Sequence, residues 1–271
     1  MLWWVFNDTL KPHYETGGSA FGFEIHGKAY AFTCPTISTT DEAINYTTFY
    51  QYKIINRSPN TYHDMYIGLW CDEDLGNAVD DYVGCDTSLD AGFAYNGDND
   101  DDGAAGYGLN PPMQDITILK GPLADVGDGI DNNHNGTIDE VGETIGLSHF
   151  QYHNNDFTSA GNPQTADDYY QYLQSIWLDG LPVTYGGGGR SGTTTSNFMF
   201  SGTPFDTGWT MFNAGIPTSE VRSLMSSGPF TIAPGEERTI DFAYVFTWDS
   251  TQANGLTTSI ARNTADLQRV K

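Results

Sequence analysis

The chain has 271 residues, and its 35 Asp and Glu against 11 Lys and Arg give a formal net charge of −24. So acidic a surface disfavours nucleic acid and anionic membrane surfaces as partners, because both are themselves negatively charged. Aromatic residues make up 14% of the chain and glycine occurs 31 times, which excludes a disordered acidic tail and favours an all-β protein with long polar loops. No apolar run approaches the ~20 residues of a membrane-spanning helix, so we expect no membrane insertion.

The first third of the chain predicts long strands. Apolar residues alternate over 21–25 and again over 30–34, and a β-bulge is expected between them at 26–28. Aromatic and β-branched residues fill 46–55 and 62–70, and a turn-forming run, Asn-Arg-Ser-Pro-Asn, separates these two segments. The two segments therefore predict a β-hairpin.

Acidic residues then concentrate in the segment 71–143. This segment holds 18 acidic residues and one basic residue, and so carries −17 of the net charge of −24. Within it, only 92–96 and 113–119 have the pattern of strands. We therefore expect a block of acidic loops inserted between the strands of one domain.

Strand patterns return in the second half of the chain, first at 145–153. Thr165 is expected to cap a helix that runs to Leu178, and a second helix is expected at 259–270. Further strands are expected at 198–200, 210–212, 223–226, 230–232 and 238–248. Many strands with one or two helices predict a β-sandwich, jelly-roll or Ig-like, over residues 1–271. The alternative is a division into two sandwiches near 155–190.

The most specific chemical motif is a calcium-type loop that begins at Asp131. Such loops place oxygen-bearing side chains at positions 1, 3 and 5, glycine at 6, a backbone carbonyl at 7 and a carboxylate at 9. The residues at these positions are Asp131, Asn133, Asn135, Gly136, Thr137 and Asp139. Because position 12 is glycine, the closing carboxylate is expected from Asp139, Glu140 or Glu143, with Asp128 as a further ligand. The alternative is a set of solvated polar turns.

Two further acidic runs predict metal ligands. Asp98, Asp100 and Asp102 repeat the D-x-D-x-D-G start of a calcium loop, although no closing carboxylate follows at the expected spacing. The other run comprises Asp72, Asp74, Asp80, Asp81 and Asp86. Carboxylates this crowded repel one another unless a divalent cation lies between them, and oxygen ligands without Cys or His select Ca²⁺. Charged surface loops without metal are the alternative.

Other candidate sites rest on fewer residues. Cys71 and Cys85 flank an acidic loop, and either a disulfide between them or two buried free thiols fits the sequence. His149 and His153 would share one face of a strand, but no third zinc ligand is evident. No serine lies in a nucleophile elbow, and the many carboxylates do not single out a glycosidase-type pair. Exposed Tyr and Trp side chains would suit sugar binding.

Several longer phrases in the chain carry a resemblance to known proteins. They include TGGSAFGFEIHGKAYAF, FYQYKIINRSPNTYHDMYIGLWCDEDLG, AYNGDNDDDG, DGIDNNHNGTIDE, DYYQYLQSIWLDG and LMSSGPFTIAPGE. Over about residues 3–265 the chain resembles the ectodomain of large secreted or surface proteins of Bacteroidota exported by the type IX secretion system. The resemblance implies an extracellular location and calcium in the acidic loops, and no established catalytic activity. Repeat modules and a C-terminal sorting domain usually follow such an ectodomain, so the chain is expected to be a fragment or a processed product.

These observations together predict a calcium-stabilised extracellular β-sandwich, secreted or at the cell surface, with a structural or adhesive role. Its expected partners are calcium ions, together with surface glycans, other surface proteins or further copies of itself. A carbohydrate-binding module and a secreted hydrolase are the alternatives. The first would need exposed aromatic rings in one plane, and the second would need two titratable groups that converge in a cleft. A non-enzymatic role is favoured.

Overall fold

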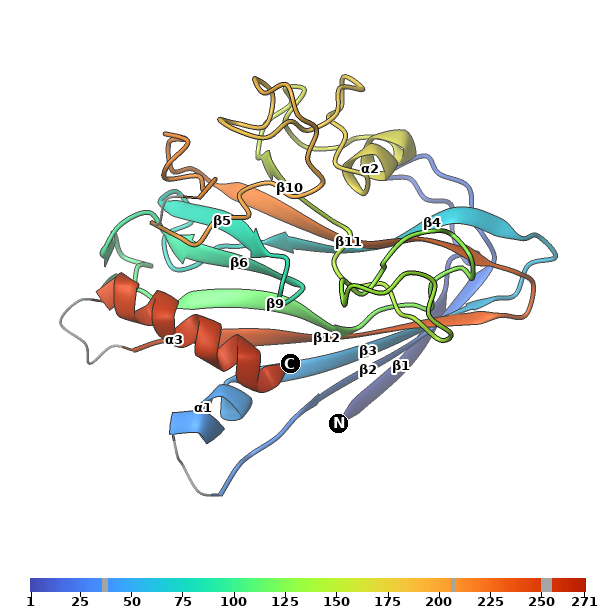
Figure 1. Cartoon of the computed structure of the whole chain (residues 1–271), viewed down its shortest axis with the longest axis horizontal. Coiled ribbons are helices and arrows are strands. Elements are labelled where there is room, and N and C mark those ends of the chain that lie inside the picture. Colours follow the sequence, from blue (N-terminus) through green and yellow to red (C-terminus); the bar gives the residue numbers. More distant parts are fainter. Residues whose placement is uncertain (36–38, 206–207, 250–254) are drawn as a thin grey trace.

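Two antiparallel β-sheets face each other in the computed structural model of the chain (Figure 1). The structure describes residues 1–35, 39–205, 208–249 and 255–271. The larger sheet has the spatial order β1 (Leu2–Asn7), β2 (Phe23–Ala31), β3 (Thr47–Asn56), β12 (Glu237–Thr247), β9 (Met113–Lys120), β6 (Ala91–Asn96) and β5 (Asp81–Asp86). The smaller sheet has the order β10 (His149–Asn154), β11 (Val221–Ile232) and β4 (Tyr62–Asp72). The predicted all-β sandwich is confirmed.

Short strands and helices complete the described part of the chain. Strands β7 (Asp100–Asp101) and β8 (Gly108–Leu109) pair within the acidic segment. Helices α1 (Thr39–Asn45) and α3 (Gly255–Val270) lie along the larger sheet, whereas α2 (Ala166–Tyr172) lies beyond the smaller sheet (Figure 1). The prediction of a C-terminal helix is confirmed.

Most of the strand predictions are confirmed. The segments 92–96, 113–119 and 238–248 correspond to β6, β9 and β12. The strands predicted at 223–226 and 230–232 are parts of one strand, β11, whose pairing with β4 changes register between them. The strand predicted at 145–153 begins only at His149.

The predicted hairpin between 46–55 and 62–70 is wrong. Strand β3 pairs with β2 and β12 in the larger sheet, whereas β4 pairs with β11 in the smaller sheet. Asn56 fixes the crossing between the sheets, because its Nδ2 donates to Asn60 O at 2.7 Å and to Ile232 O at 3.1 Å. Strands β3 and β4 therefore lie in different sheets, and their apolar side chains pack against each other between the two sheets. The predicted bulge at 26–28 is also wrong, since β2 pairs with β1 and β3 without a change of register.

Helix α2 begins at the predicted position but ends early. The Asp168 N–H donates to Thr165 Oγ1 at 3.2 Å, and the Thr165 N–H donates to the Asp168 carboxylate at 2.9 Å, which forms a capping box. Beyond Tyr172 the chain turns through Ser175, whose φ is +54°, and places Trp177 in the core. The helix therefore ends here, and the turn that follows lets the large Trp177 side chain be buried.

Side chains from both sheets and from the segment 155–220 form one core. Phe150 of β10, Ile118 of β9 and Trp177 belong to the same buried cluster. The stretches 198–200 and 210–212 were predicted as strands, but they form turns and irregular structure apart from an isolated parallel bridge between Phe198 and Phe150. Their apolar residues fill the core from a loop, which explains why their pattern resembled that of buried strands.

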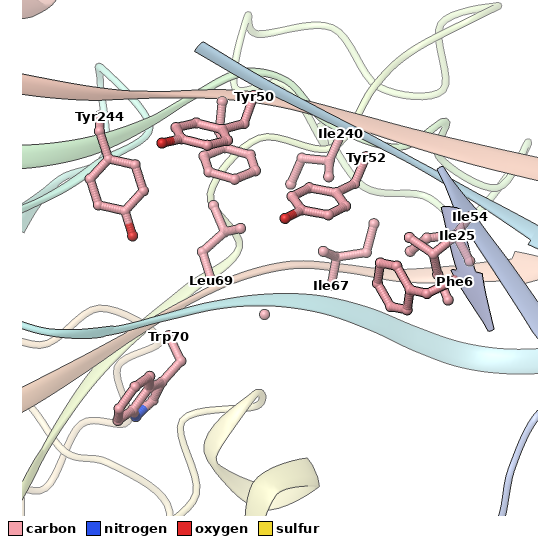
Figure 2. A pocket seen from close by; sticks show the side chains of 12 residues that line it. Phe6, Ile25, Tyr50, Tyr52, Ile54, Ile67, Leu69, Trp70, Ile240 and Tyr244 are labelled. Atoms are coloured by element: carbon pink, nitrogen blue, oxygen red, sulfur yellow. The ribbon is translucent and has the colours of Figure 1, made fainter. Parts of the chain in front are cut away.

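An apolar groove opens where the smaller sheet no longer covers the larger one. It has a volume of about 670 Å³. Its walls are Phe6, Ile25, Tyr50, Tyr52, Ile54, Ile67, Gly68, Leu69, Trp70, Ile240, Phe242 and Tyr244. Tyr50, Tyr52 and Tyr244 project from the larger sheet (Figure 2). Leu69 lies opposite them on β4, whereas the Trp70 ring points to the other side of that strand (Figure 2).

Replacement of Trp177 by alanine is expected to lower the free energy of unfolding by about 3–5 kcal/mol. The change opens a cavity and leaves the Gly189 carbonyl without the indole N–H, which lies 3.1 Å away. Phe157 lies in the same segment and is 83% exposed, so Phe157→Ala should change stability by no more than about 0.5 kcal/mol. Urea unfolding curves measure both variants, and similar losses for the two would contradict this account of the core.

Candidate metal centres

The loop 128–143 lies between β9 and β10 and is closed at its base. Leu123 and Thr144 form an isolated antiparallel bridge, and the Ala124 N–H donates to Glu143 O at 3.0 Å. Just beyond the end of the loop, the Gly146 N–H donates to Asn132 O at 3.0 Å. These bonds join the two ends of the loop, so the residues between them are confined to a compact turn.

Three side chains of the predicted calcium motif turn toward one another. The Asn135 N–H donates to both Asp131 Oδ1 and Asn133 Oδ1, each at 3.0 Å. The Thr137 N–H donates to Asn135 Oδ1 at 2.8 Å. Gly136 has a φ of +94°, the left-handed conformation that glycine adopts without strain, and its N–H donates to Asp131 Oδ2 at 2.8 Å. The structure thus brings the side-chain oxygens of positions 1 and 3 to one donor, the backbone N–H of position 5.

Glu140 is the carboxylate that faces these residues. Its Oε2 accepts from Asn133 Nδ2 at 3.1 Å and from Asn135 Nδ2 at 2.6 Å. Among the three closing ligands proposed from the sequence, Glu140 is therefore the one that contacts positions 3 and 5.

The other carboxylates of the loop bind backbone N–H groups. Glu143 is 6% exposed, and its Oε1 accepts from the N–H groups of Asn132 and Asn133 at 2.7 and 3.3 Å. Asp139 accepts from the Gly129 N–H at 3.0 Å, and Asp128 accepts from the Ile130 N–H at 2.9 Å. These residues stabilise the shape of the loop.

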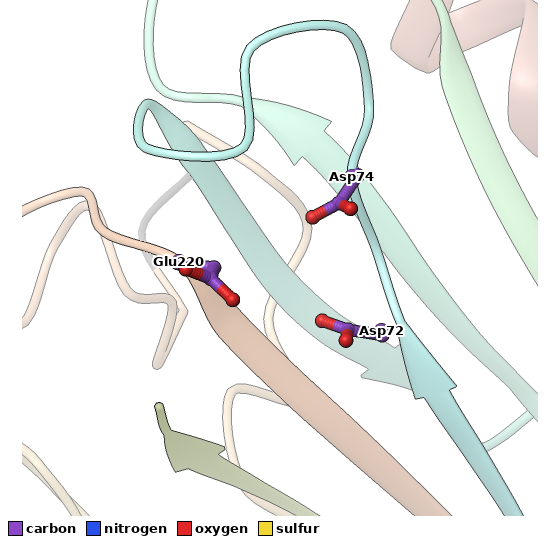
Figure 3. A group of neighbouring side chains, drawn as sticks. All are labelled: Asp72, Asp74 and Glu220. Atoms are coloured by element: carbon purple, nitrogen blue, oxygen red, sulfur yellow. The ribbon is translucent and has the colours of Figure 1, made fainter. Parts of the chain in front are cut away.

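A second acidic group lies where β4 and β11 run side by side. Asp72 and Asp74, both predicted as ligands, meet Glu220 (Figure 3). Their carboxylate oxygens lie within 4.8 Å of one another, and no other set of three Asp, Glu, His or Cys in the described residues does so. Arg222 already provides a positive charge there, since its Nη2 lies 3.0 Å from Asp72 and 2.8 Å from Glu220. The sequence did not reveal Glu220, because its position depends on the pairing of two distant strands.

In the run 98–103, the three residues predicted as ligands, Asp98, Asp100 and Asp102, are exposed. Asp98 accepts from the Asp100 N–H at 2.8 Å in a local turn, and Asp102 contributes its N–H to Asp80 Oδ2 at 3.1 Å. The buried side chain of this run is Asp101, which is 1% exposed. The D-x-D-x-D spacing had left Asp101 out of the predicted ligands. The two carboxylate oxygens of Asp101 accept from the N–H groups of Asn77 and Tyr107 at 3.0 and 2.8 Å.

Asp86 and Asp81 lie at opposite ends of β5 and have different environments. Asp86 holds the turn after the strand, since its Oδ1 accepts from the N–H groups of Ser88 and Leu89 at 2.9 and 3.2 Å. Asp81 is fully buried, and its Oδ2 accepts from the Leu75 N–H at 3.0 Å. Burial, reinforced by neighbouring carboxylates, raises the pKa of Asp81 to about 9.

Within the described part of the chain, no cysteine or histidine belongs to a group of three side chains close enough to share a metal ion. Cys71 and Cys85 are both free and buried, and burial raises the pKa of the Cys71 thiol to about 12. His153 stacks on Tyr172 with ring centroids 5.5 Å apart, and its Nε2 accepts from Trp70 Nε1 at 3.2 Å. His153 is thus engaged in packing and in a hydrogen bond.

Comparison with known proteins leaves the chain without a functional assignment. No known protein family matches the chain, and no curated protein matches it. Over the described residues, none of the helices combines the length and the apolar character that a bilayer crossing requires. Any functional proposal therefore depends on the sites themselves.

Replacement of Arg222 by glutamine is expected to lower the free energy of unfolding by about 1–2 kcal/mol, because it leaves Asp72, Asp74 and Glu220 without their cation. The control is Arg57→Gln, since Arg57 is a largely exposed side chain that pairs with Glu24 at 2.9 Å and should contribute less than about 1 kcal/mol. Urea unfolding in a calcium-free buffer measures both. Equal losses for the two variants would show that Arg222 has no special role in this group.

Proposed function

We propose that the chain is a calcium-stabilised extracellular module with a structural or adhesive role, and that the loop 128–143 is its principal calcium site. One observation carries the proposal: Asp131 Oδ1 and Asn133 Oδ1 accept from the same Asn135 N–H within one tight turn, and Glu140 accepts from the side-chain amides of Asn133 and Asn135. The ion would lie among these four side chains, with the Thr137 carbonyl and water completing its shell of six to eight oxygens.

The chemistry of the donors favours calcium over other metals. Carboxylate and amide oxygens without sulfur or imidazole are ligands for hard cations. Each such oxygen has two lone pairs, so an oxygen that already accepts one backbone N–H can still coordinate an ion. The segment 71–143 also carries 18 acidic residues against one basic residue, and a bound divalent ion reduces that repulsion locally.

An extracellular location fits such a site. Extracellular calcium modules bind with dissociation constants on the order of 10⁻⁴–10⁻³ M, and millimolar calcium outside the cell fills them. The resemblance to ectodomains exported by the type IX secretion system supports the same location. The walls of the apolar groove contain no Asp, Glu or His, so the groove offers no support for the hydrolase alternative.

Removal of calcium with EDTA is expected to lower the melting temperature by several degrees and to make the loop 128–143 accessible to protease. At a calcium concentration of about ten times the dissociation constant, binding stabilises the folded state by about 1.4 kcal/mol, which corresponds to several degrees for a chain of this size. Asp131→Ala should weaken calcium binding at least tenfold. Glu15→Gln removes an exposed carboxylate elsewhere and should not change it. Equal melting temperatures in EDTA and in millimolar calcium would overturn the proposal.

The groove supports a second candidate function, binding of a carbohydrate. Its volume of about 670 Å³ suits a small ligand. Three tyrosine hydroxyl groups lie in otherwise apolar walls, a combination that can both contact a sugar ring and form hydrogen bonds with it. Tyr50 and Tyr52 each stack on Phe242, with interplanar angles of 12° and 5°, so their ring planes are nearly parallel.

Replacement of Tyr52 by alanine is expected to weaken oligosaccharide binding at least tenfold if the groove is a sugar site, since a stacking ring and a hydroxyl group are both lost. Tyr14 is 86% exposed and lies outside the groove, so Tyr14→Ala should leave affinity unchanged. Affinity is measured on a panel of soluble oligosaccharides. Absence of binding by the unmodified chain across the panel would count against this second function.

A further inference from the structure

The edge of the larger sheet formed by β5 and β6 contains buried polar atoms without partners. Asp81 and Asn96 are directly paired across the two strands, so their side chains share one face of the sheet. Both residues are 0% exposed. In each, Oδ1 receives no hydrogen bond. A buried acceptor without a donor costs on the order of 1–3 kcal/mol, so this pair needs a physical explanation.

A third unpartnered oxygen belongs to Asp80, the residue that precedes Asp81 in the chain. Asp80 Oδ1 is also buried without a partner, while its Oδ2 accepts from Asn77 Nδ2 at 3.2 Å and from the Asp102 N–H at 3.1 Å. No ion pair between described residues involves Asp80, Asp81 or Asp101. Carboxyl groups are therefore gathered here without a basic side chain paired to them.

The surrounding loops hold these groups in place. The Gly97 N–H donates to Asp80 O at 2.7 Å, which ties the end of β6 to the start of β5. Gly76 has a φ of +77°, and a Cβ there would lie only 1.9 Å from Asp101 Oδ2. Glycine at this position lets the loop 73–80 close onto the buried Asp101 carboxylate. Two acidic loops thus pack together over the paired ends of the strands.

We propose that Asp80 Oδ1, Asp81 Oδ1 and Asn96 Oδ1 are ligands of a second calcium ion, which joins the loops 73–80 and 97–103 to the β5–β6 edge. All three donors are oxygens, which selects a hard cation, and calcium accepts amide and carbonyl oxygens in a flexible shell. The third donor is the Asn96 amide oxygen, which is 0% exposed as Asp81 is and lies on the same face of the strand pair. This site is separate from the loop 128–143 and does not depend on it.

A proton is the rival to the ion. A protonated Asp81 could donate its O–H to Asn96 Oδ1, and this bond would satisfy two of the three oxygens without metal. The Asp81→Asn variant distinguishes a bound calcium ion from a bound proton. An amide reproduces a protonated carboxyl group as a hydrogen-bond donor, but it removes the charge that an ion needs.

The test uses the full chain carrying Asp131→Ala, which removes the first site, and measures calcium binding by titration calorimetry. One calcium per chain should still bind. Adding Asp81→Asn should weaken that binding at least tenfold, whereas adding Asp167→Asn, which changes an exposed residue of α2, should not. Unchanged affinity with Asp81→Asn, or no binding by the Asp131→Ala chain, would overturn the second site. If Asp131→Ala binds calcium as the unmodified chain does, the first site fails and the second does not.

A second variant tests the same site in case the Asp81→Asn chain does not fold. Asn96→Asp adds a carboxylate at the proposed ion, so it should raise calcium affinity several-fold and lower the melting temperature in EDTA. If a proton occupies this place, Asn96→Asp should leave calcium affinity unchanged, and that result would overturn the site. Circular dichroism of each variant in calcium reports whether it has folded.

Discussion

Carboxylates in this protein rely on backbone N–H groups for much of their hydrogen bonding, and the order of the acidic loops depends on this interaction. With 35 acidic and 11 basic side chains, ion pairs cannot compensate the charge. Asp8 accepts from the three consecutive N–H groups of 21–23 at 2.6–3.1 Å, and Asp101 and Glu143 each accept from two. Such bonds satisfy the oxygens but leave the negative charge in place. Cations from solvent are therefore the natural complement to this fold.

The unequal width of the two sheets separates charged and apolar surfaces. Helices α1 and α3 pack on the outer face of the larger sheet, where Leu267 joins Phe49 and Val245 in a cluster. On the inner face, the smaller sheet leaves the region near β1 uncovered, and the groove opens there. The β5–β6 edge, with its buried acidic groups, lies at the opposite end of the strand order. An ion at one edge and a ligand in the groove would therefore interact little.

Contacts between residues close in the sequence could be predicted, whereas contacts that depend on the pairing of distant segments were missed. The contacts of Asp131, Asn133 and Asn135 arise within one turn, so their spacing was enough to bring them together. Asp101 was missed because its inward direction depends on the N–H of Asn77 in another loop. Glu220 and the crossing from β3 to β4 were missed for the same reason, since both depend on the register of β11 with β4. Alternating apolar residues indicate that a strand is buried but not which sheet contains it.

The two proposed calcium sites differ in what the protein does without the ion. In the loop 128–143, Asp131 and Glu140 already accept hydrogen bonds, so their oxygens keep partners when calcium leaves and the exposed loop opens locally at small cost. At the β5–β6 edge, Asp81 and Asn96 have buried oxygens that nothing satisfies, so either an ion or a proton must be taken up as the protein folds. Occupancy there is coupled to the pairing of two core strands, because the ligands lie on the strands themselves. Under the proposal, loss of calcium would loosen only the exposed loop at the first site, whereas loss of the buried ion would destabilise the paired strands themselves.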